Sequence, residues 1–431
     1  MDIITLYSAF LKHPSVSTDT RKLTIGSIFF ALSGPNFNGN QFAKTALEKG
    51  CALVVIDQVE FKLNDKYLLV DDVLIALQQL ALHHRKQMKA IIIGITGSNG
   101  KTTTKELLYS VLSKRYKTLA TFGNLNNHIG VPLTLLQLTE IHEMAVIEMG
   151  ANKQGDIKEL VEIAEPDFGL ITNIGKAHLE GMGGYEGVIK TKTELYDFIR
   201  HSERHLFVNT LHEVFIKKSI GINQHTFGNS ISDDVIGAYL GSSPFVHLKW
   251  RTKEETTEHE VNSQLMGGYN YENILAAIAV GAYFEVPAAL ISDAIAAYSP
   301  TNNRSQLLET PNNSLILDAY NANPTSMEAA LLNFKTLPVA NKVVIIGKMM
   351  ELGDTAALEH QKLVQFIRDC KFYKVFLIGE PYQKIAVESS TILFENVDEA
   401  IAYFEKSPLS GCTILIKGSR ANQLERLQPL F

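Results

Sequence analysis

The sequence is poor in the residues that mark several specialised classes of protein. Its 431 residues include three cysteines, Cys51, Cys370 and Cys412, which lie far apart and outside any metal-ligand spacing. This scarcity argues against a disulfide framework and is typical of a reducing compartment. Acidic residues outnumber basic ones, 46 to 40, and the basic residues form no block. That balance argues against a protein that binds nucleic acid or an anionic membrane.

Long hydrophobic segments are also missing. The most apolar stretch, ILAAIAVGAYF (274–284), is too short to span a bilayer and is followed by Glu285. The N-terminal MDIITLYSAFLKHPS has neither the basic start nor the long apolar core of a signal peptide. We therefore expect a cytoplasmic protein with no membrane insertion and no nucleic-acid partner.

The chain is long enough for two or three domains, and 45% of its residues are hydrophobic, which is ample for sizeable cores. Strand-like runs alternate with helical ones, a pattern that predicts α/β layers. GSIFFAL (26–32) and CALVVID (51–57) flank a helical segment and predict a small βαβ unit. The turn-rich SPTNNRSQ (299–306) is typical of a joint between domains. The predicted domains are residues 1–83, 84–298 and 299–431.

The two larger predicted domains each contain several strand-like runs. In the central one, further strands are expected at 144–150, 168–174 and 205–209. A polar β-hairpin is expected at 230–263, and a long Ala-rich helical stretch at 271–297. In the last domain four apolar runs alternate with helical segments and predict a second parallel sheet. These runs are SLILDAY, KVVIIGK, KVFLIGE and TILIKGS.

The stretch ITGSNGKTTTKELL (95–108) predicts a phosphate-binding loop. AIIIG (90–94) before it is typical of a buried strand, and the apolar residues after it have helical spacing. Gly97 and Gly100 therefore lie between a strand and a helix, where backbone N–H groups and the positive end of the helix bind anions.

The next two residues of this loop are suited to a nucleotide and its metal ion. Lys101 would reach the outer phosphates, and Thr102 would offer its hydroxyl to Mg²⁺. The spacing departs from the usual loop, which has four residues between its glycines. Gly97 and Gly100 have two, and Ile95 stands where the first glycine is expected. An ordinary glycine turn before a helix is the alternative.

Several charged residues after the loop are candidates for chemistry. Glu148 ends the apolar strand AVIEMG, at the sheet edge where open α/β sheets bind ligands, and a charge there is costly unless it faces a cleft or a cation. His178 follows the next predicted strand. Lys190, Lys192 and Glu194 lie near the start of a helix. The alternatives are a structural carboxylate, a structural histidine and a solvated helix face.

The predicted C-terminal domain adds two candidates. Arg304 is a suitable clamp for phosphate or carboxylate, because its planar fork binds oxyanions through two hydrogen bonds. Asp318 ends a strand, and the loop NANPTS after it leads into a helix that begins near Pro324. Either residue could instead be an ordinary part of a loop.

Eight motifs occur in an order that resembles the Mur ligases of peptidoglycan synthesis along essentially the whole chain. They are TGSNGKTTTKE, GNLNNHIGVPLTLL, VIEMGA, TNIGKAHLEGMGG, GGYNYENILAA, NNRSQ, DAYNANPTSM and IKGSRANQLERL. Within the family, DAYNANP and GNLNNHIGVPLTLL resemble the members that join D-alanyl-D-alanine to UDP-N-acetylmuramoyl-tripeptide. Residues 17–57 resemble the UDP-binding domain of those members, and the DNPR-type motif of the diaminopimelate- or lysine-adding members is not found.

The resemblance implies three α/β domains: a small N-terminal UDP-binding domain, a central P-loop ATPase-like domain with a mostly parallel sheet, and a C-terminal Rossmann-like domain. It implies an ATP- and Mg²⁺-dependent amide ligase that activates a carboxylate as an acyl phosphate and yields the pentapeptide precursor of peptidoglycan. A monomer is expected. A ligase similar to folylpolyglutamate synthase and a P-loop ATPase that makes no bond are the alternatives.

The resemblance also assigns roles to individual residues. Lys101, Glu148, His178 and Lys192 would be catalytic, and Thr102, Glu148, His178 and Lys192 would hold Mg²⁺. The nucleotide would contact Gly97, Ser98, Asn99, Gly100, Lys101, Thr102, Thr103, Asn273, Arg304 and Asp318, with Asn273 at the adenine. The other substrates would contact Thr20, Arg21, Gly34, Asn38, Gly39, Asn124, Asn126, Asn127, Asn321, Lys417 and Arg420. For the N-terminal five, simple turn chemistry in SGPNFNGN is the alternative.

One assignment involves a chemical modification. The sequence KTELY (192–196) matches the family's spacing between an aromatic residue and a lysine that CO₂ carbamylates, which selects Lys192 over Lys190. A carbamylated lysine would be an anion beside the second Mg²⁺.

The sequence departs from the family pattern at two positions. Tyr269 stands where the family commonly has histidine, and Lys348 stands where it has aspartate. The roles of both positions are left open, as is the base that takes the amine proton. Whether the tripeptide ends in diaminopimelate or lysine is also open.

Overall fold

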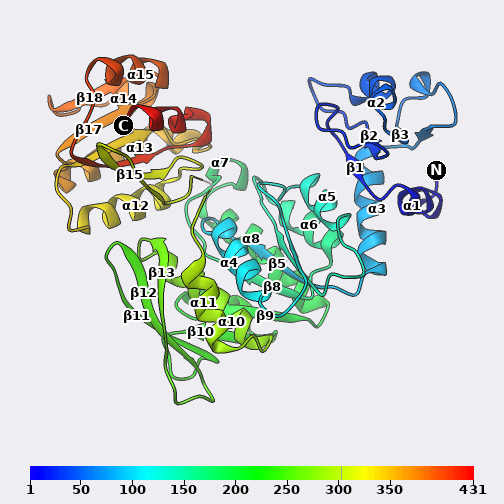
Figure 1. Ribbon diagram of the computed structural model, residues 1–431, viewed down its shortest axis with the longest axis horizontal. Helices are drawn as coiled ribbons and strands as arrows, with labels where there is room; N and C mark the ends of the chain where they lie inside the picture. The colour runs from blue at the N-terminus through cyan, green and yellow to red at the C-terminus, as the bar shows by residue number, and fades with distance from the viewer. Residues whose placement is uncertain (302) are drawn as a thin grey trace.

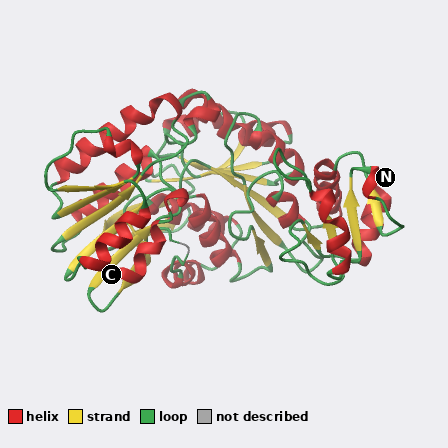
Figure 2. Ribbon diagram, turned by 90° about the horizontal axis from the view of Figure 1, so that it is seen from above, coloured by secondary structure: helices red, strands yellow, loops and turns green. Residues whose placement is uncertain are grey.

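The computed structural model describes residues 1–301 and 303–431, and Asn302 of the motif NNRSQ lies outside the described residues. Three β-sheets follow one another along an elongated molecule (Figures 1 and 2). The N- and C-termini lie toward opposite ends of it. No helix in the described part of the chain is long and apolar enough to cross a membrane.

The first sheet has four parallel strands in the order β1-β2-β3-β4. Its elements are α1 (Ile3–Lys12), β1 (Val16–Ser17), β2 (Ile28–Phe30), α2 (Ala43–Glu48), β3 (Leu53–Ile56) and β4 (Tyr67–Leu69). The β2-α2-β3 segment confirms the βαβ unit predicted near the N-terminus. Helix α3 (Val73–Gln87) packs against α1 and also against the central helices α5 and α6. The boundary at residue 83 falls inside α3, and both domain boundaries stay predictions.

The second sheet has nine strands in the order β13-β12-β11-β10-β9-β8-β5-β7-β6. Its parallel part comprises β5 (Ile91–Thr96), β6 (Thr118–Ala120), β7 (Met144–Glu148), β8 (Phe168–Ile171), β9 (His205–Asn209), β10 (Asn223–Gly228) and β11 (Val235–Ser242). The predicted polar hairpin is an antiparallel extension in which β12 (Phe245–Thr252) pairs with β11 and β13 (His259–Met266).

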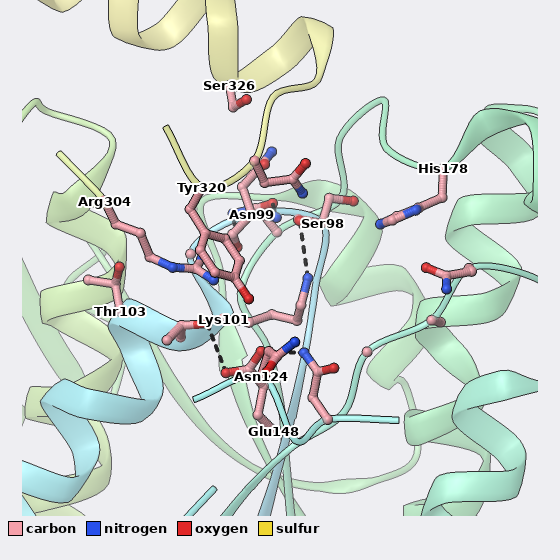
Figure 3. Close-up of a pocket in the computed structure, with 18 of the residues that line it drawn as sticks. Ser98, Asn99, Lys101, Thr103, Asn124, Glu148, His178, Arg304, Tyr320 and Ser326 are labelled. Carbon is pink, nitrogen blue, oxygen red and sulfur yellow. Dashed lines mark hydrogen bonds between the residues drawn. The ribbon is translucent and has the colours of Figure 1, made fainter. Parts of the chain in front are cut away.

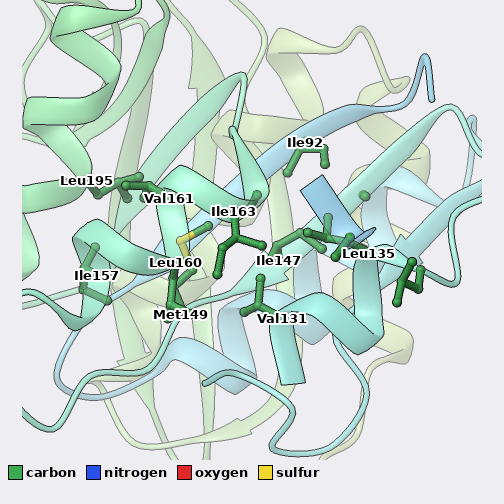
Figure 4. Packing of buried hydrophobic residues seen from close by; sticks show 14 of the residues in the cluster. Ile92, Val131, Leu135, Ile147, Met149, Ile157, Leu160, Val161, Ile163 and Leu195 are labelled. Carbon is green, nitrogen blue, oxygen red and sulfur yellow. The ribbon is translucent and has the colours of Figure 1, made fainter. Parts of the chain in front are cut away.

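Helices cover both faces of this sheet and bury two hydrophobic clusters. They are α4 (Lys101–Leu112), α5 (Gly130–Leu135), α6 (Asp156–Ala164), α7 (Leu179–Met182), α8 (Tyr185–His201), α9 (Glu213–Ser219), α10 (Asn270–Tyr283) and α11 (Ala288–Ala297). In Figure 4, Val131 on α5 and Leu160 on α6 pack toward Ile147 of β7. The predicted helical stretch at 271–297 is interrupted, because Glu285 takes a left-handed φ of 54° and Pro287 precedes a new helix.

The third sheet has the order β14-β15-β19-β16-β17-β18 and is parallel except for β14, which pairs antiparallel with β15. Its strands are β14 (Gln306–Glu309), β15 (Asn313–Asp318), β16 (Lys342–Gly347), β17 (Lys374–Ile378), β18 (Thr391–Phe394) and β19 (Cys412–Lys417). The helices α12 (Pro324–Thr336), α13 (Ala356–Cys370), α14 (Glu380–Gln383) and α15 (Val397–Lys406) accompany it, and clusters of buried apolar residues lie on both faces. The predicted α/β class with three sheets is confirmed.

Candidate active site

The loop between β5 and α4 adopts a conformation that requires its glycines. Gly97 has a φ of 150° and Gly100 a φ of 76°. A Cβ atom on Gly97 would lie 2.0 Å from Thr172 Oγ1, and one on Gly100 would lie 2.4 Å from Asn273 Oδ1. Both glycines are therefore required, because a side chain at either position would collide with a neighbouring residue. The loop leads directly into the N-terminus of α4, where anions bind.

Lys101, the first residue of α4, folds back over this loop. Its Nζ donates hydrogen bonds to the backbone oxygens of Gly97, at 2.7 Å, and Ser98, at 3.2 Å. Desolvation lowers the pKa of Lys101 to about 8; Glu148 opposes the shift and Arg304 adds to it. A phosphate in front of the loop would offset this crowding of positive charge.

Glu148 ends β7 beside the start of α4. It is 1% exposed, and its two carboxylate oxygens accept hydrogen bonds from Thr102 Oγ1, at 2.9 Å, and from Asn126 Nδ2, at 2.7 Å. Thr102 and Glu148 thus offer hard oxygen ligands at one point, the kind that Mg²⁺ prefers. No group of three or more His, Cys, Asp or Glu residues in the described chain could hold a metal ion.

His178 lines the same cavity at another side. It has a left-handed φ of 52° just before α7, and its Nδ1 lies against the carboxylate of Glu351, in a loop of the third sheet. Figure 3 shows His178 and Arg304 on opposite sides of Lys101. Three of the four predicted metal ligands, Thr102, Glu148 and His178, therefore line the cavity, and the role of His178 stays a prediction.

Lys192 lies on α8 and is 1% exposed, whereas its neighbour Lys190 is exposed. Its Nζ has no hydrogen-bond partner in the part of the chain that the structure describes. Desolvation holds the pKa of Lys192 well below its ordinary value, and the charge of Lys101 lowers it further. A solvated helix face is thus excluded for Lys192.

Asn273 lies beneath the phosphate loop. Its Oδ1 accepts a hydrogen bond from Thr104 Oγ1 at 3.1 Å, and its Nδ2 donates to Asn270 Oδ1 at 2.8 Å. These bonds fix Asn273 against Gly100. Its predicted contact with adenine stays a prediction.

Residues of the third sheet and its loops form the wall of the cavity that lies opposite the phosphate loop. Asp318 and Lys417 are register partners at the carboxyl ends of β15 and β19, and their side chains form an ion pair of 2.6 Å. The guanidinium carbon of Arg304 lies 3.9 Å from the ring centre of Tyr320, and that of Arg420 lies 5.7 Å from it. Among the described residues Arg304 Nε is buried without a hydrogen-bond partner, which suits it to a bound anion.

Two hydrogen bonds between the walls were not predicted from the sequence. Asn323 Nδ2 donates to Asn99 Oδ1 of the phosphate loop at 2.8 Å, and Lys176 N donates to Thr325 Oγ1 at 3.0 Å. Asn323 is held by a capping box with Ser326 at the start of α12. The sequence NPTS signals this cap, but nothing in it signals the distant partner.

The cavity between these walls has a volume of about 1210 Å³. The predicted residues that line it are Ser98, Asn99, Gly100, Lys101, Thr102, Thr103, Asn124, Asn126, Asn127, Glu148, His178, Asn273, Arg304, Asp318, Asn321, Lys417 and Arg420. Those that do not line it are Gly97, Lys192, Thr20, Arg21, Gly34, Asn38 and Gly39.

The N-terminal candidates lie in the loops that follow β1 and β2, neighbouring parallel strands whose carboxyl ends share one sheet edge. Arg21 is exposed and pairs with Asp19 at 2.8 Å, and Asn38 Nδ2 donates to Gln58 Oε1 at 2.9 Å. Gly39 is required by packing, since a Cβ atom would lie 2.1 Å from a backbone oxygen. Their role in binding stays a prediction.

Comparisons with known proteins agree with this arrangement. The family model described as Mur ligase middle domain matches residues 95–281, and the one described as Mur ligase, glutamate ligase domain matches residues 303–420. The UDP-N-acetylmuramoyl-tripeptide–D-alanyl-D-alanine ligase of Bacillus subtilis is 35% identical over 426 residues, which cover 96% of this chain and 92% of that protein.

Two solved structures are similar over nearly the whole chain. A crystal structure of MurF from Acinetobacter baumannii has a TM-score of 0.85 and 29% identity, covering 96% of this chain and 92% of that one. The MurF ligase from Thermotoga maritima in complex with ADP has a TM-score of 0.83 and 25% identity, covering 98% and 97%. The chain therefore belongs to the Mur ligase family.

Proposed function

We propose that this protein is an ATP-dependent ligase that joins D-alanyl-D-alanine to UDP-N-acetylmuramoyl-tripeptide and so makes the pentapeptide precursor of peptidoglycan. The observation that carries the proposal is the cavity between a phosphate loop and a second wall that bears Arg304, Lys417 and Arg420. The name of the Bacillus subtilis relative supports this choice of substrates. The reaction would take place in the cytoplasm, where ATP is available.

The chemistry follows from the poor reactivity of a carboxylate. Its oxygen first attacks the γ-phosphorus of ATP, which breaks the bond to the bridging oxygen and releases ADP. The resulting acyl phosphate has a good leaving group. The amine of D-alanyl-D-alanine then attacks the carbonyl carbon, phosphate leaves with the electrons of the C–O bond, and the amine gives up a proton to a base that is still unassigned. An enzyme accelerates such a reaction mainly by positioning the reactants and by neutralising the charge on the phosphoryl group.

The residues around the cavity suit these steps. Lys101 would contact the outer phosphates, and Arg304 would approach the nucleotide from the opposite wall, together with Asp318. Thr102 and Glu148 would hold one Mg²⁺ and His178 would help to hold another. When bound, Mg²⁺ neutralises phosphate charge. Two hydrogen bonds join the walls of the cavity, and closure of the walls around the bound substrates would exclude water from the acyl phosphate.

The remaining candidates are assigned to the other substrates. Residues 1–83 would bind the uridine nucleotide through the loops after β1 and β2, residues 84–298 would carry the ATP site, and residues 299–431 would complete it. Asn124, Asn126 and Asn127, with Asn321, Lys417 and Arg420 across the cavity, would contact the peptide parts.

We also propose that CO₂ carbamylates Lys192. Carbamylation requires a neutral amine, and burial disfavours the charged form of this lysine. Its unpartnered Nζ leaves a buried polar atom unsatisfied, which a carbamate bound to Mg²⁺ would correct. The product is an anion close to the positive charge of Lys101.

The proposed function is tested by phosphate release from ATP in the presence of each peptide substrate alone and of both together. A ligase releases phosphate with both and forms the pentapeptide, which mass spectrometry of the product detects. Comparing substrates whose tripeptide ends in diaminopimelate with those that end in lysine identifies the third residue of the preferred tripeptide. Phosphate release that is indifferent to both substrates would show an ATPase that makes no bond, and ligation of glutamate to a folate would favour the folylpolyglutamate alternative.

Arg21→Ala is expected to raise the KM for the UDP-substrate about tenfold or more and to leave the KM for ATP nearly unchanged. The reason is the loss of a charge-assisted hydrogen bond to the uridine nucleotide, far from the ATP cavity. Initial rates with each substrate varied in turn measure both constants. Lys22→Ala, at the exposed neighbouring residue, is the matched control. An equal rise in both constants would point to misfolding and contradict the assignment.

A further inference from the structure

Tyr269 joins the central sheet to the segment that leads into the third sheet. It precedes α10, lines the cavity and is 37% exposed. A hydrogen bond of 2.7 Å joins its hydroxyl oxygen to Ser305 Oγ. Ser305 lies just before β14, so this bond connects two parts of the chain that are 36 residues apart.

The segment around Ser305 has an unfavourable backbone conformation. Asn303 has a φ of 57° and Ser305 a φ of 50°, in the left-handed region, which asparagine tolerates but serine rarely adopts. Such conformations persist only where surrounding contacts impose them. The bond from Tyr269 is one such contact, because it holds Ser305 by its side chain.

Arg304 lies between these two left-handed residues. Its guanidinium stacks on Tyr320 at 3.9 Å, and its buried Nε has no partner within residues 1–301 and 303–431. Figure 3 shows Arg304 reaching toward Tyr320 and the region of Lys101. The direction of the Arg304 side chain therefore depends on the backbone that Tyr269 and Ser305 fix.

Tyr269 is itself held in place. A Cβ atom on Gly267 would lie 2.4 Å from the Tyr269 ring, and Gly267 has a φ of 87°. The ring thus packs directly on a backbone that only glycine allows. A phenylalanine would keep this packing and lose only the hydroxyl.

We propose that Tyr269 is a positioning residue, which holds Ser305 and thereby aims Arg304 at the phosphates of the bound nucleotide. The inference rests on the proposed function, because it takes Arg304 to face ATP.

The test measures the Kd of the full-length protein for ADP and for a non-hydrolysable ATP analogue by calorimetry. Tyr269→Phe is expected to raise the Kd of the ATP analogue about 2- to 10-fold, the range for one lost hydrogen bond. Ser305→Ala should reproduce that rise. In a protein that already carries Arg304→Ala, Tyr269→Phe should add no further change, because its effect acts through Arg304.

Tyr116→Phe is the matched control, since the Tyr116 hydroxyl donates a hydrogen bond of 2.7 Å to the Phe284 backbone oxygen and Tyr116 does not line the cavity. The Kd of this variant should equal that of the unmodified protein. The proposal is overturned if Tyr269→Phe leaves the Kd unchanged, or if its full effect persists with Arg304→Ala.

Amide formation is measured in parallel. An unmodified protein that binds the analogue but forms no amide contradicts the proposed function, while the Kd comparison still decides the role of Tyr269.

Discussion

Lys101→Ala is expected to abolish ligation in a protein that remains folded. In the proposed reaction Lys101 neutralises charge on the transferring phosphoryl group, and loss of one such contact typically costs about 10²–10³-fold in rate. Folding should tolerate the change, because the side chain is a desolvated cation whose hydrogen bonds are confined to its own loop. Pentapeptide formation and thermal unfolding, measured on the same preparation, separate the two effects.

Lys114→Ala is the control for this experiment, since Lys114 is an exposed lysine just beyond the end of α4. It should ligate like the unmodified protein. Near-normal ligation by folded Lys101→Ala would remove Lys101 from the mechanism. A large drop in melting temperature would instead show that its bonds to Gly97 and Ser98 stabilise the loop.

The second large effect is expected for Lys192→Ala, which should lose ligation almost completely. The variant removes the carbamate anion proposed to help hold Mg²⁺, and it leaves a space in a buried site. Formate or acetate should partly restore the rate, because a small carboxylate can occupy that space and replace the missing charge. The measurement is the ligation rate as a function of added carboxylate.

Lys190→Ala is the natural comparison, because Lys190 lies on the same helix but is exposed. It should ligate normally and show no response to formate. If Lys190→Ala is inactive and Lys192→Ala is active, the wrong lysine has been assigned. If Lys192→Ala is inactive and no carboxylate restores it, the lysine is needed in another form than the carbamate.

The sequence predicts the phosphate loop well because all its signals are local. An apolar run, two glycines and a helical pattern follow within about twenty residues, and the structure differs mainly in extending β5 to Thr96. Short strands are harder to predict. β14 (Gln306–Glu309) follows a turn-rich joint and becomes a strand only by pairing with β15, which is a tertiary contact.

Contacts between distant parts of the chain also limit what the sequence predicts about the candidate site. Motifs predicted that Lys101, Glu148 and Arg304 would share one cavity, and they do. The contacts of Asn99 with Asn323 and of Tyr269 with Ser305 were not predictable, because each joins residues that meet only after two sheets have formed. No periodicity or spacing along the chain encodes such pairs.

The hydrogen bond between Asn99 and Asn323 has a pharmacological consequence. Asn323 Oδ1 already accepts a hydrogen bond from Ser326 N in the cap of α12. The Nδ2 end of its side-chain amide therefore faces the phosphate loop. A small inhibitor with a hydrogen-bond acceptor for Asn323 Nδ2 would replace its bond to Asn99 and hold the two walls apart. Such a compound would also weaken nucleotide binding, because Arg304 and Asp318 approach the nucleotide from the second wall. Since coupling between two ligands is reciprocal, a higher ATP concentration would partly relieve the inhibition.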